Sequence, residues 1–322
     1  MNFRLRFLLF TVTMLLNSFG AFAQVDKEDT SGDNTEDLEK ILEKESMHTP
    51  KPSDHYVSAT FKSTRIIDGQ SIENVGKGVL DFRISHRFGE LSEGIKNLYG
   101  IDNATTKFGF DYGITNWLMA GVGRSSFEKE YDGFFKVKII HQRNDDRVPV
   151  SVSYYSAISV RTMDVINIPG YTYYFSNRLF YANQLLVARK FNNLFSLQLM
   201  PTYLHYNLVE DASQPNEVFA IGVGGRIKVS KRVAITGEYY YNIPGYKLSG
   251  YNNPVSVGID VETGGHVFQL FLTNSPNLTE RSFIGETIGD ITKGAIHLGF
   301  NISRVFTIVQ TAESKNLGNK IW

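Results

Sequence analysis

Strict alternation between apolar and polar side chains, repeated along most of the chain, is the feature that most limits how this sequence can fold. In residues 253–275, every odd position of Val255–Val261 is apolar, whereas Asp260 and Glu262 lie on the opposite side of the same segment. A period of two predicts a strand with one apolar and one polar face. Thr263–Gly265 then allow a tight reversal into a second strand, because glycine reaches positive φ without steric cost.

This pattern recurs about a dozen times in segments of around ten residues, as expected for strands that cross a membrane. Tight turns such as Asn192-Asn193 and Ser230-Lys231 alternate with longer connections, which fall near residues 89–102, 127–132, 161–177, 207–216 and 243–253. Short turns at one end and long loops at the other are typical of outer-membrane barrels. We therefore predict an all-β fold, a transmembrane antiparallel up-and-down β-barrel of about 12 strands, with 14 as the alternative. Its first strand is predicted at residues 56–66.

Ionisable side chains occupy the polar face of many of these predicted strands. In a soluble core they would be costly to bury, but in a closed barrel they face a lumen where water or opposite charges solvate them. A secreted β-sandwich with its charges outward is the rival fold, and the strand number and loop rhythm favour the barrel. The candidates for lining the lumen are Asp81, Arg83, Arg87, Lys107, Asp111, Lys136, Lys138, Arg226, Lys228, Glu238, Asp260 and Glu262.

The first 23 residues have the parts of a secretory signal peptide. Arg4 and Arg6 form a basic start, residues 7–16 are apolar, and Ala21-Phe22-Ala23 fits a cleavage site. The apolar run is too short to cross about 30 Å of hydrocarbon. We expect a signal peptide (1–23) that is cleaved near Ala23, a mostly disordered acidic periplasmic arm (24–55), the barrel (56–309) and a C-terminal tail (310–322).

Composition argues against several classes of function. The formal net charge is zero, so no excess of basic residues favours a nucleic-acid partner. The chain has no cysteine, which excludes disulfides, thiolate metal sites, thiol nucleophiles and an anchor on an N-terminal cysteine.

Several motifs together resemble an uncharacterised family of outer-membrane β-barrel proteins seen in Bacteroidetes, a domain of unknown function. The motifs are His86-Arg87-Phe88-Gly89, residues 110–124 (FDYGITNWLMAGVGR), Ala188-Arg189-Lys190-Phe191, residues 260–275 and residues 300–306 (FNISRVF). The resemblance covers roughly residues 56–306. It implies a barrel in the outer membrane and supplies no activity, substrate or catalytic residue.

Candidate chemistry is sparse. Glu262 and His266 flank a turn and, with Asp260, could bind a cation at the rim, but an ion pair or hydrogen bond is the better explanation for so few ligands. A Ser-His hydrolase is a weak alternative, because the histidines at 86, 141, 205 and 297 lie on different predicted strands. We expect no catalytic residue, metal or cofactor.

Two functions of different class fit these sequence features. The first is a pore or transporter that passes small solutes through a charged lumen. The second is a non-conducting structural or assembly barrel that binds periplasmic or outer-membrane proteins. Outer-membrane lipid is an expected partner in both cases, and a barrel of about 12 strands is near the width at which side chains either fill the bore or leave a narrow path.

Overall fold

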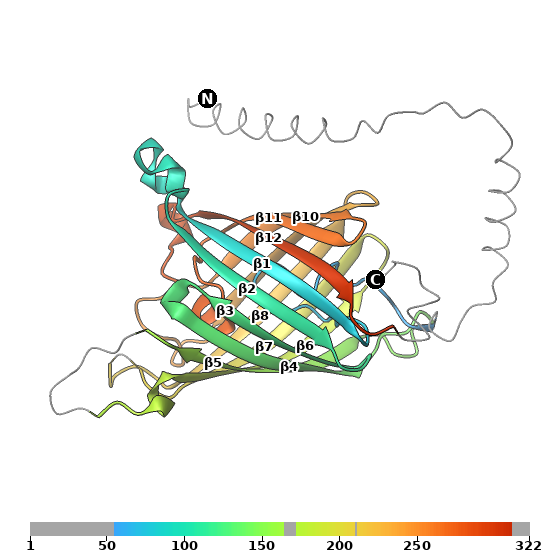
Figure 1. Cartoon of the computed structure of the whole chain (residues 1–322), viewed down its shortest axis with the longest axis horizontal. Coiled ribbons are helices and arrows are strands. Elements are labelled where there is room, and N and C mark those ends of the chain that lie inside the picture. Colours follow the sequence, from blue (N-terminus) through green and yellow to red (C-terminus); the bar gives the residue numbers. More distant parts are fainter. Residues whose placement is uncertain (1–54, 164–171, 210, 311–322) are drawn as a thin grey trace, which may run out of the picture. The chain divides into compact units, whose positions relative to one another are not determined.

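Twelve antiparallel strands close into one barrel in a computed structural model that describes residues 55–163, 172–209 and 211–310 (Figure 1). Each strand pairs with its neighbours in sequence, and pairing of the first with the last closes the sheet. The predicted fold and strand number are confirmed. The expected signal peptide, nearly all of the acidic arm and the C-terminal tail lie outside the described residues. The strands are β1 (Val79–Glu90), β2 (Ala104–Gly113), β3 (Leu118–Ser125), β4 (Glu130–Ile140), β5 (Ser151–Arg161), β6 (Leu179–Lys190), β7 (Phe195–Tyr206), β8 (Glu217–Lys228), β9 (Val233–Asn242), β10 (Val255–Thr263), β11 (His266–Thr273) and β12 (His297–Thr307).

The two ends of the barrel differ in the length of their connections. Most turns at one end have two to four residues, and their side chains satisfy the local backbone. In the β6–β7 turn, for example, the Asn192 carboxamide oxygen accepts hydrogen bonds from the amides of Leu194 and Phe195, both at 2.8 Å. In the β10–β11 turn, Gly264 and Gly265 adopt φ of 49° and 129°, which glycine tolerates. In barrels of this class the short turns face the periplasm and the long loops face outward.

The long-loop end carries short helical segments. These are η3 (Leu91–Glu93), η4 (Ile95–Gly100), η5 (Phe127–Lys129), η6 (Phe175–Arg178), the π-helical η7 (Arg281–Gly285) and η8 (Ile291–Lys293). In the described part of the chain, no helix has the length and apolar character needed to span a membrane.

Side chains alternate between the two surfaces of the barrel wall along most of each strand. Outward-facing Phe108, Val122 and Ile259 are 45%, 60% and 46% exposed, whereas inward-facing Asp81 and Lys136 are fully buried. A predominantly apolar exterior is what a sheet in contact with lipid requires, and closure leaves no unpaired edge. The period-two pattern of the sequence therefore predicts which side chains face the lumen and which face lipid.

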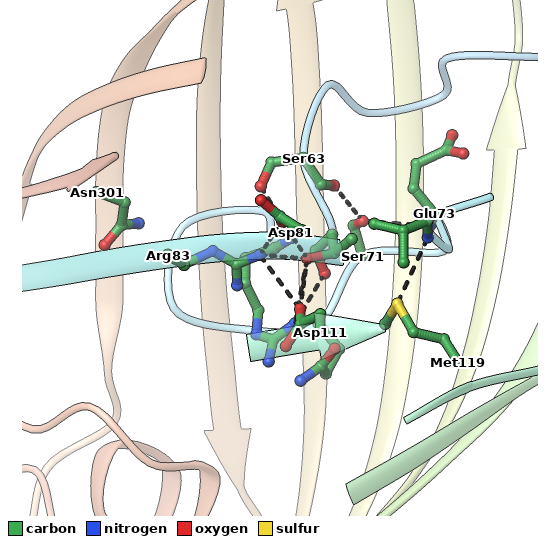
Figure 2. Close-up of polar contacts among 12 residues, drawn as sticks. Ser63, Ser71, Glu73, Asp81, Arg83, Asp111, Met119 and Asn301 are labelled. Carbon is green, nitrogen blue, oxygen red and sulfur yellow. Dashed lines mark hydrogen bonds and ion pairs between the residues drawn. The ribbon is translucent and has the colours of Figure 1, made fainter. Parts of the chain in front are cut away.

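The prediction of a first barrel strand at residues 56–66 is wrong. All but Tyr56 belong to a segment, residues 57–75, that we call the plug, which runs inside the barrel (Figure 2) and reverses at Ile67–Gly69. The reversal is closed by the bond from the Ile66 amide to the Gly69 carbonyl (2.8 Å) and by a bridge between Arg65 and Gln70. The plug sequence alternates between apolar and polar residues, as a strand does, because one side of the plug faces apolar wall residues and the other side faces polar ones.

Candidate functional site: the occupied lumen

The plug packs one side of its chain into an apolar part of the lumen. Phe61, Ile66, Ile72 and Val75 are at most 1% exposed and belong to one hydrophobic cluster. Their neighbours in that cluster are inward-facing residues of the wall, including Met119, Phe134, Tyr155, Leu186, Met200 and Tyr240. This half of the lumen is therefore a packed core.

The opposite side of the plug meets ionisable side chains of β1 and β2 (Figure 2). Asp111 accepts hydrogen bonds from the Thr64 hydroxyl (2.9 Å) and the Arg65 guanidinium (3.1 Å). Arg83 donates to Asp81 (2.8 Å) and Asp111 (3.3 Å), and also contacts the Thr64 hydroxyl. Two carboxylates thus share two guanidinium groups, one from the wall and one from the plug, which satisfies charges that would otherwise be costly to bury.

The tip of the plug is held through its backbone. The Glu238 carboxylate accepts from the amides of Ile67 (3.4 Å), Asp68 (2.7 Å) and Gly69 (3.1 Å). The Asn301 carboxamide donates to the Ile67 carbonyl at 2.8 Å. Arg87 forms a salt bridge with Asp68 and lies over the Phe271 ring. The wall therefore presents donors and acceptors that match a chain folded inside it.

Lys136 holds the part of the plug that returns to the wall. Its ammonium group donates to the carbonyls of Ser71 (2.9 Å) and Glu73 (2.6 Å), and to the side chain of Gln70 (3.4 Å). Gln198 donates to the Gln70 carbonyl at 2.7 Å. The plug explains why this lysine is buried. Its carbonyls have left water and need hydrogen-bond donors, which the ammonium group supplies.

A second segment fills the lumen from the long-loop end. Residues 274–289 of the β11–β12 connection, which we call the inner loop, are mostly buried and contain η7. Arg281 contacts Glu128, pairs with Glu130 (3.1 Å) and binds both carboxylate oxygens of Glu286 (2.7 and 2.6 Å). Burial raises the pKa of Glu286 to about 7, even though Arg281 favours its charged form.

The plug and the inner loop meet inside the barrel. The Gln70 carboxamide donates to the Glu280 carboxylate at 2.8 Å, and both side chains are buried. A cavity of about 30 Å³ lies beside this contact, lined by charged groups that include Arg65, Asp68, Arg83, Arg87, Lys107, Asp111, Asp132 and Glu280. One water molecule needs about 10–15 Å³ of such space, so the cavity has room for two or three.

All twelve lumen candidates lie in the inward phase of their strands, and nine of them sit along the inner surface away from the ends. The nine are Asp81, Arg83, Arg87, Lys107, Asp111, Lys136, Arg226, Glu238 and Asp260, and the first six lie on β1, β2 and β4. Lys138, Lys228 and Glu262 lie near the short-turn end and are half-buried. Lys138 adjoins a bulge in the β4–β5 pairing, which shifts the alternation there.

The rim residues do not form a cation site in the part of the chain that the structure describes, where no group of three potential ligands is found. Glu262 instead pairs with Lys62 at 2.6 Å. His266 stacks on Phe268 at the outer surface, with a centroid distance of 5.9 Å. The histidines at 141 and 297 bond to the carbonyls of Val57 and Phe88.

Sequence reasoning missed several inward groups that matter for the lumen. Glu130 and Asp132 occupy the inward phase of β4, and Asp132 pairs with Lys107 at 2.8 Å. The predicted connection near residues 127–132 is too long, because β4 begins at Glu130, and the same period of two extended to that residue would have identified both. Glu280 and Arg281 carried no such signal, because they lie in a loop that folds inward.

A closed barrel with an apolar exterior and a charged, filled interior defines an integral β-barrel of the bacterial outer membrane. The chain belongs to the family described as "Membrane bound beta barrel domain (DUF5777)", whose model matches residues 61–306. The resemblance seen in the sequence is confirmed at that level. No curated protein matches the sequence.

Solved structures of similar fold include porins and an enzyme. The NanC porin is 10% identical, with 71% of this chain and 100% of that chain covered and a TM-score of 0.45. Omp33 of Acinetobacter baumannii is 10% identical, with 74% and 100% covered and a TM-score of 0.39. An active-site mutant of outer membrane phospholipase A from Escherichia coli is 9% identical, with 71% and 91% covered and a TM-score of 0.43. At this identity the likeness concerns the barrel fold.

Proposed function

We propose that this outer-membrane barrel is closed in its resting state and acts as a non-conducting structural or assembly barrel. The observation that carries the proposal is the contact between Gln70 of the plug and Glu280 of the inner loop, because it joins two buried segments that enter from opposite ends. The adjoining cavity has room for a few water molecules, which supports a lumen without a continuous aqueous path.

Apolar burial further supports a plug that stays in place. Phe61, Ile66, Ile67, Ile72 and Val75 are at most 1% exposed. Each such side chain contributes about 1.5–3 kcal/mol on leaving water, and a displaced plug would forfeit that contribution. A water-filled lumen would also leave Met200, Leu186 and Tyr240 of the wall exposed, which is unfavourable in a channel.

A gated channel is the second candidate, and the ionic side of the lumen favours it. Arg87 and Asp111 of the wall pair with Asp68 and Arg65 of the plug, and water could solvate these charges if the plug moved. The acidic arm precedes the plug in sequence, so a periplasmic partner that binds the arm could displace the plug. Small solutes would then pass along β1, β2 and β12.

An enzymatic role has less support. A Ser-His site needs a serine hydroxyl within hydrogen-bonding reach of a histidine ring, but the rings of His86, His141 and His297 bond to backbone carbonyls. For a structural or assembly barrel, we propose outer-membrane lipid and periplasmic or outer-membrane proteins as partners. We also propose that the protein comes from a bacterium of the Bacteroidetes.

Conductance in planar lipid bilayers tests the proposal. We expect the purified mature chain to insert without stepwise current, while its altered mobility on unboiled gels shows that it is folded. Frequent channels of uniform conductance from the unaltered chain would overturn the closed-barrel proposal. Brief, rare openings that become frequent when Phe61 and Ile72 are replaced by serine would favour the gated channel.

A further inference from the structure

The lipid-facing surface carries a polar patch on β5 and β6, formed by Tyr154, Ser156 and Asn183. All three occupy the outward phase of their strands. Their neighbours along the chain, Tyr155 on β5 and Gln184 on β6, face inward. Ser156 is the sixth of the eleven residues of β5, so the patch lies near the middle of the wall. Other strands are apolar outward at their centres, as Phe110 and Leu270 illustrate.

The groups of the patch are only partly satisfied. The Tyr154 hydroxyl donates to the Asn183 carboxamide oxygen at 2.6 Å. Within the described residues, this is the one hydrogen bond of the Asn183 side chain, so its amide group has no acceptor there. Ser156 lies directly opposite Asn183 in the β5–β6 pairing, so its hydroxyl belongs to the same small surface.

An interruption of the β6–β7 ladder adjoins the patch. Gln184 pairs with Thr202 and Val187 pairs with Leu199, but the two positions between them are not paired. Pro201 lies at this point and has no N–H to donate. The defect places an incompletely bonded stretch of backbone beside Asn183, in a layer where lipid offers no hydrogen bonds.

We propose that this face is where two copies of the chain associate in the membrane. A group that satisfies Asn183 must itself lie within the hydrocarbon layer, and acyl chains have neither donors nor acceptors. A carboxamide and a hydroxyl carry both, so the patch complements itself across a two-fold axis along the membrane normal. The Asn183 amide of one copy then donates to Asn183 or Ser156 of the other, as polar side chains do between membrane segments.

The rim of the patch suits such a contact. Leu185 and Leu199 are 41% and 45% exposed, and the Tyr203 ring packs at a tilt against the Phe219 ring on the same outer surface. These side chains would pack around the central polar pair and exclude lipid from it. This inference does not depend on whether the lumen conducts, so it can fail while the closed-barrel proposal stands.

The absence of cysteine makes cross-linking a direct test, because a single substitution introduces the only thiol. Ser156→Cys in native outer membranes should give a disulfide-linked dimer on treatment with iodine, which enters the hydrocarbon layer and is reduced to iodide as the two thiols are oxidised. Leu270→Cys, which is equally outward on β11, is the matched control and should remain monomeric. Equal yields at both positions, whether high or low, would overturn the proposed face and leave lipid or another protein as its occupant.

A second substitution tests whether the Asn183 carboxamide contributes to dimer formation. In the Ser156→Cys background, Asn183→Leu should lower the dimer association constant in mild detergent about tenfold, which corresponds to about 1.4 kcal/mol. Unboiled gels establish that the variant is folded. An unchanged dimer fraction in the folded variant would contradict the role assigned to Asn183.

Discussion

A buried charged side chain needs bonding partners, so its contacts show what fills the lumen. Lys136 is the clearest case. Its ammonium group bonds to the carbonyls of Ser71 and Glu73. Lys136→Met keeps the length of the side chain but leaves these carbonyls without a donor, at a cost of about 1–3 kcal/mol for each buried group. We expect faster hydrogen exchange in residues 70–75, with exchange of the barrel strands unchanged.

Lys138→Met is the matched control, because Lys138 lies two residues further along the same strand and is half-buried beside the bulge. It should leave the plug as protected as in the unaltered chain. If the plug remained fully protected in Lys136→Met, the lysine would not be holding it, and its bonds would be incidental to plug position.

Among whole elements, the strands could be predicted from the sequence, whereas the plug and the inner loop could not. Lipid forces apolar residues outward at every second position, so Arg83 and Phe82 of β1 reveal their sides directly. Residues 56–66 show a similar alternation for another reason, since Phe61 meets the apolar wall while Thr64 meets Asp111. The inward fold of Glu280 and Arg281 depends on contacts with distant strands, which no local pattern records.

The inner loop should respond to pH through Glu286. Burial raises its pKa from 4.5 to about 7. A raised pKa means that the protonated form fits the folded loop better, so its contribution is full below about pH 4.5 and is lost as pH rises through 7. Between pH 5.5 and 8.5 we expect residues 274–289 to lose protection by up to about 2 kcal/mol, since one pKa unit corresponds to about 1.4 kcal/mol.

Hydrogen exchange, corrected for the intrinsic effect of pH, measures this change. Glu286→Gln should remove the pH dependence, because the carboxamide stays neutral and can still accept a bond from Arg281. A pH dependence that persists in Glu286→Gln would show that another group causes it.

At the scale of the whole molecule, the lumen combines two kinds of wall around the same plug. Met200, Leu186 and Tyr240 belong to an apolar half, and Arg83, Asp111 and Glu238 belong to an ionic half. The barrel ladder itself does not include the plug, since all twelve strands pair around it. The wall can therefore remain closed if the plug leaves, and the ionic half can then be hydrated.

This separation predicts that loosening the plug creates a channel without unfolding the barrel. Replacing Phe61, Ile66, Ile67, Ile72 and Val75 together by serine removes the apolar contribution of the plug, at about 1.5–3 kcal/mol for each side chain. Planar bilayers should then show stepwise current, and unboiled gels should still show a folded barrel. Serine at Tyr173, Tyr174 and Phe175, which are exposed in the β5–β6 loop, serves as the control and should leave the membrane silent. A folded plug variant without current would mean that the inner loop alone closes the lumen, because its contacts with Glu130, Tyr206 and Asn242 do not involve the plug.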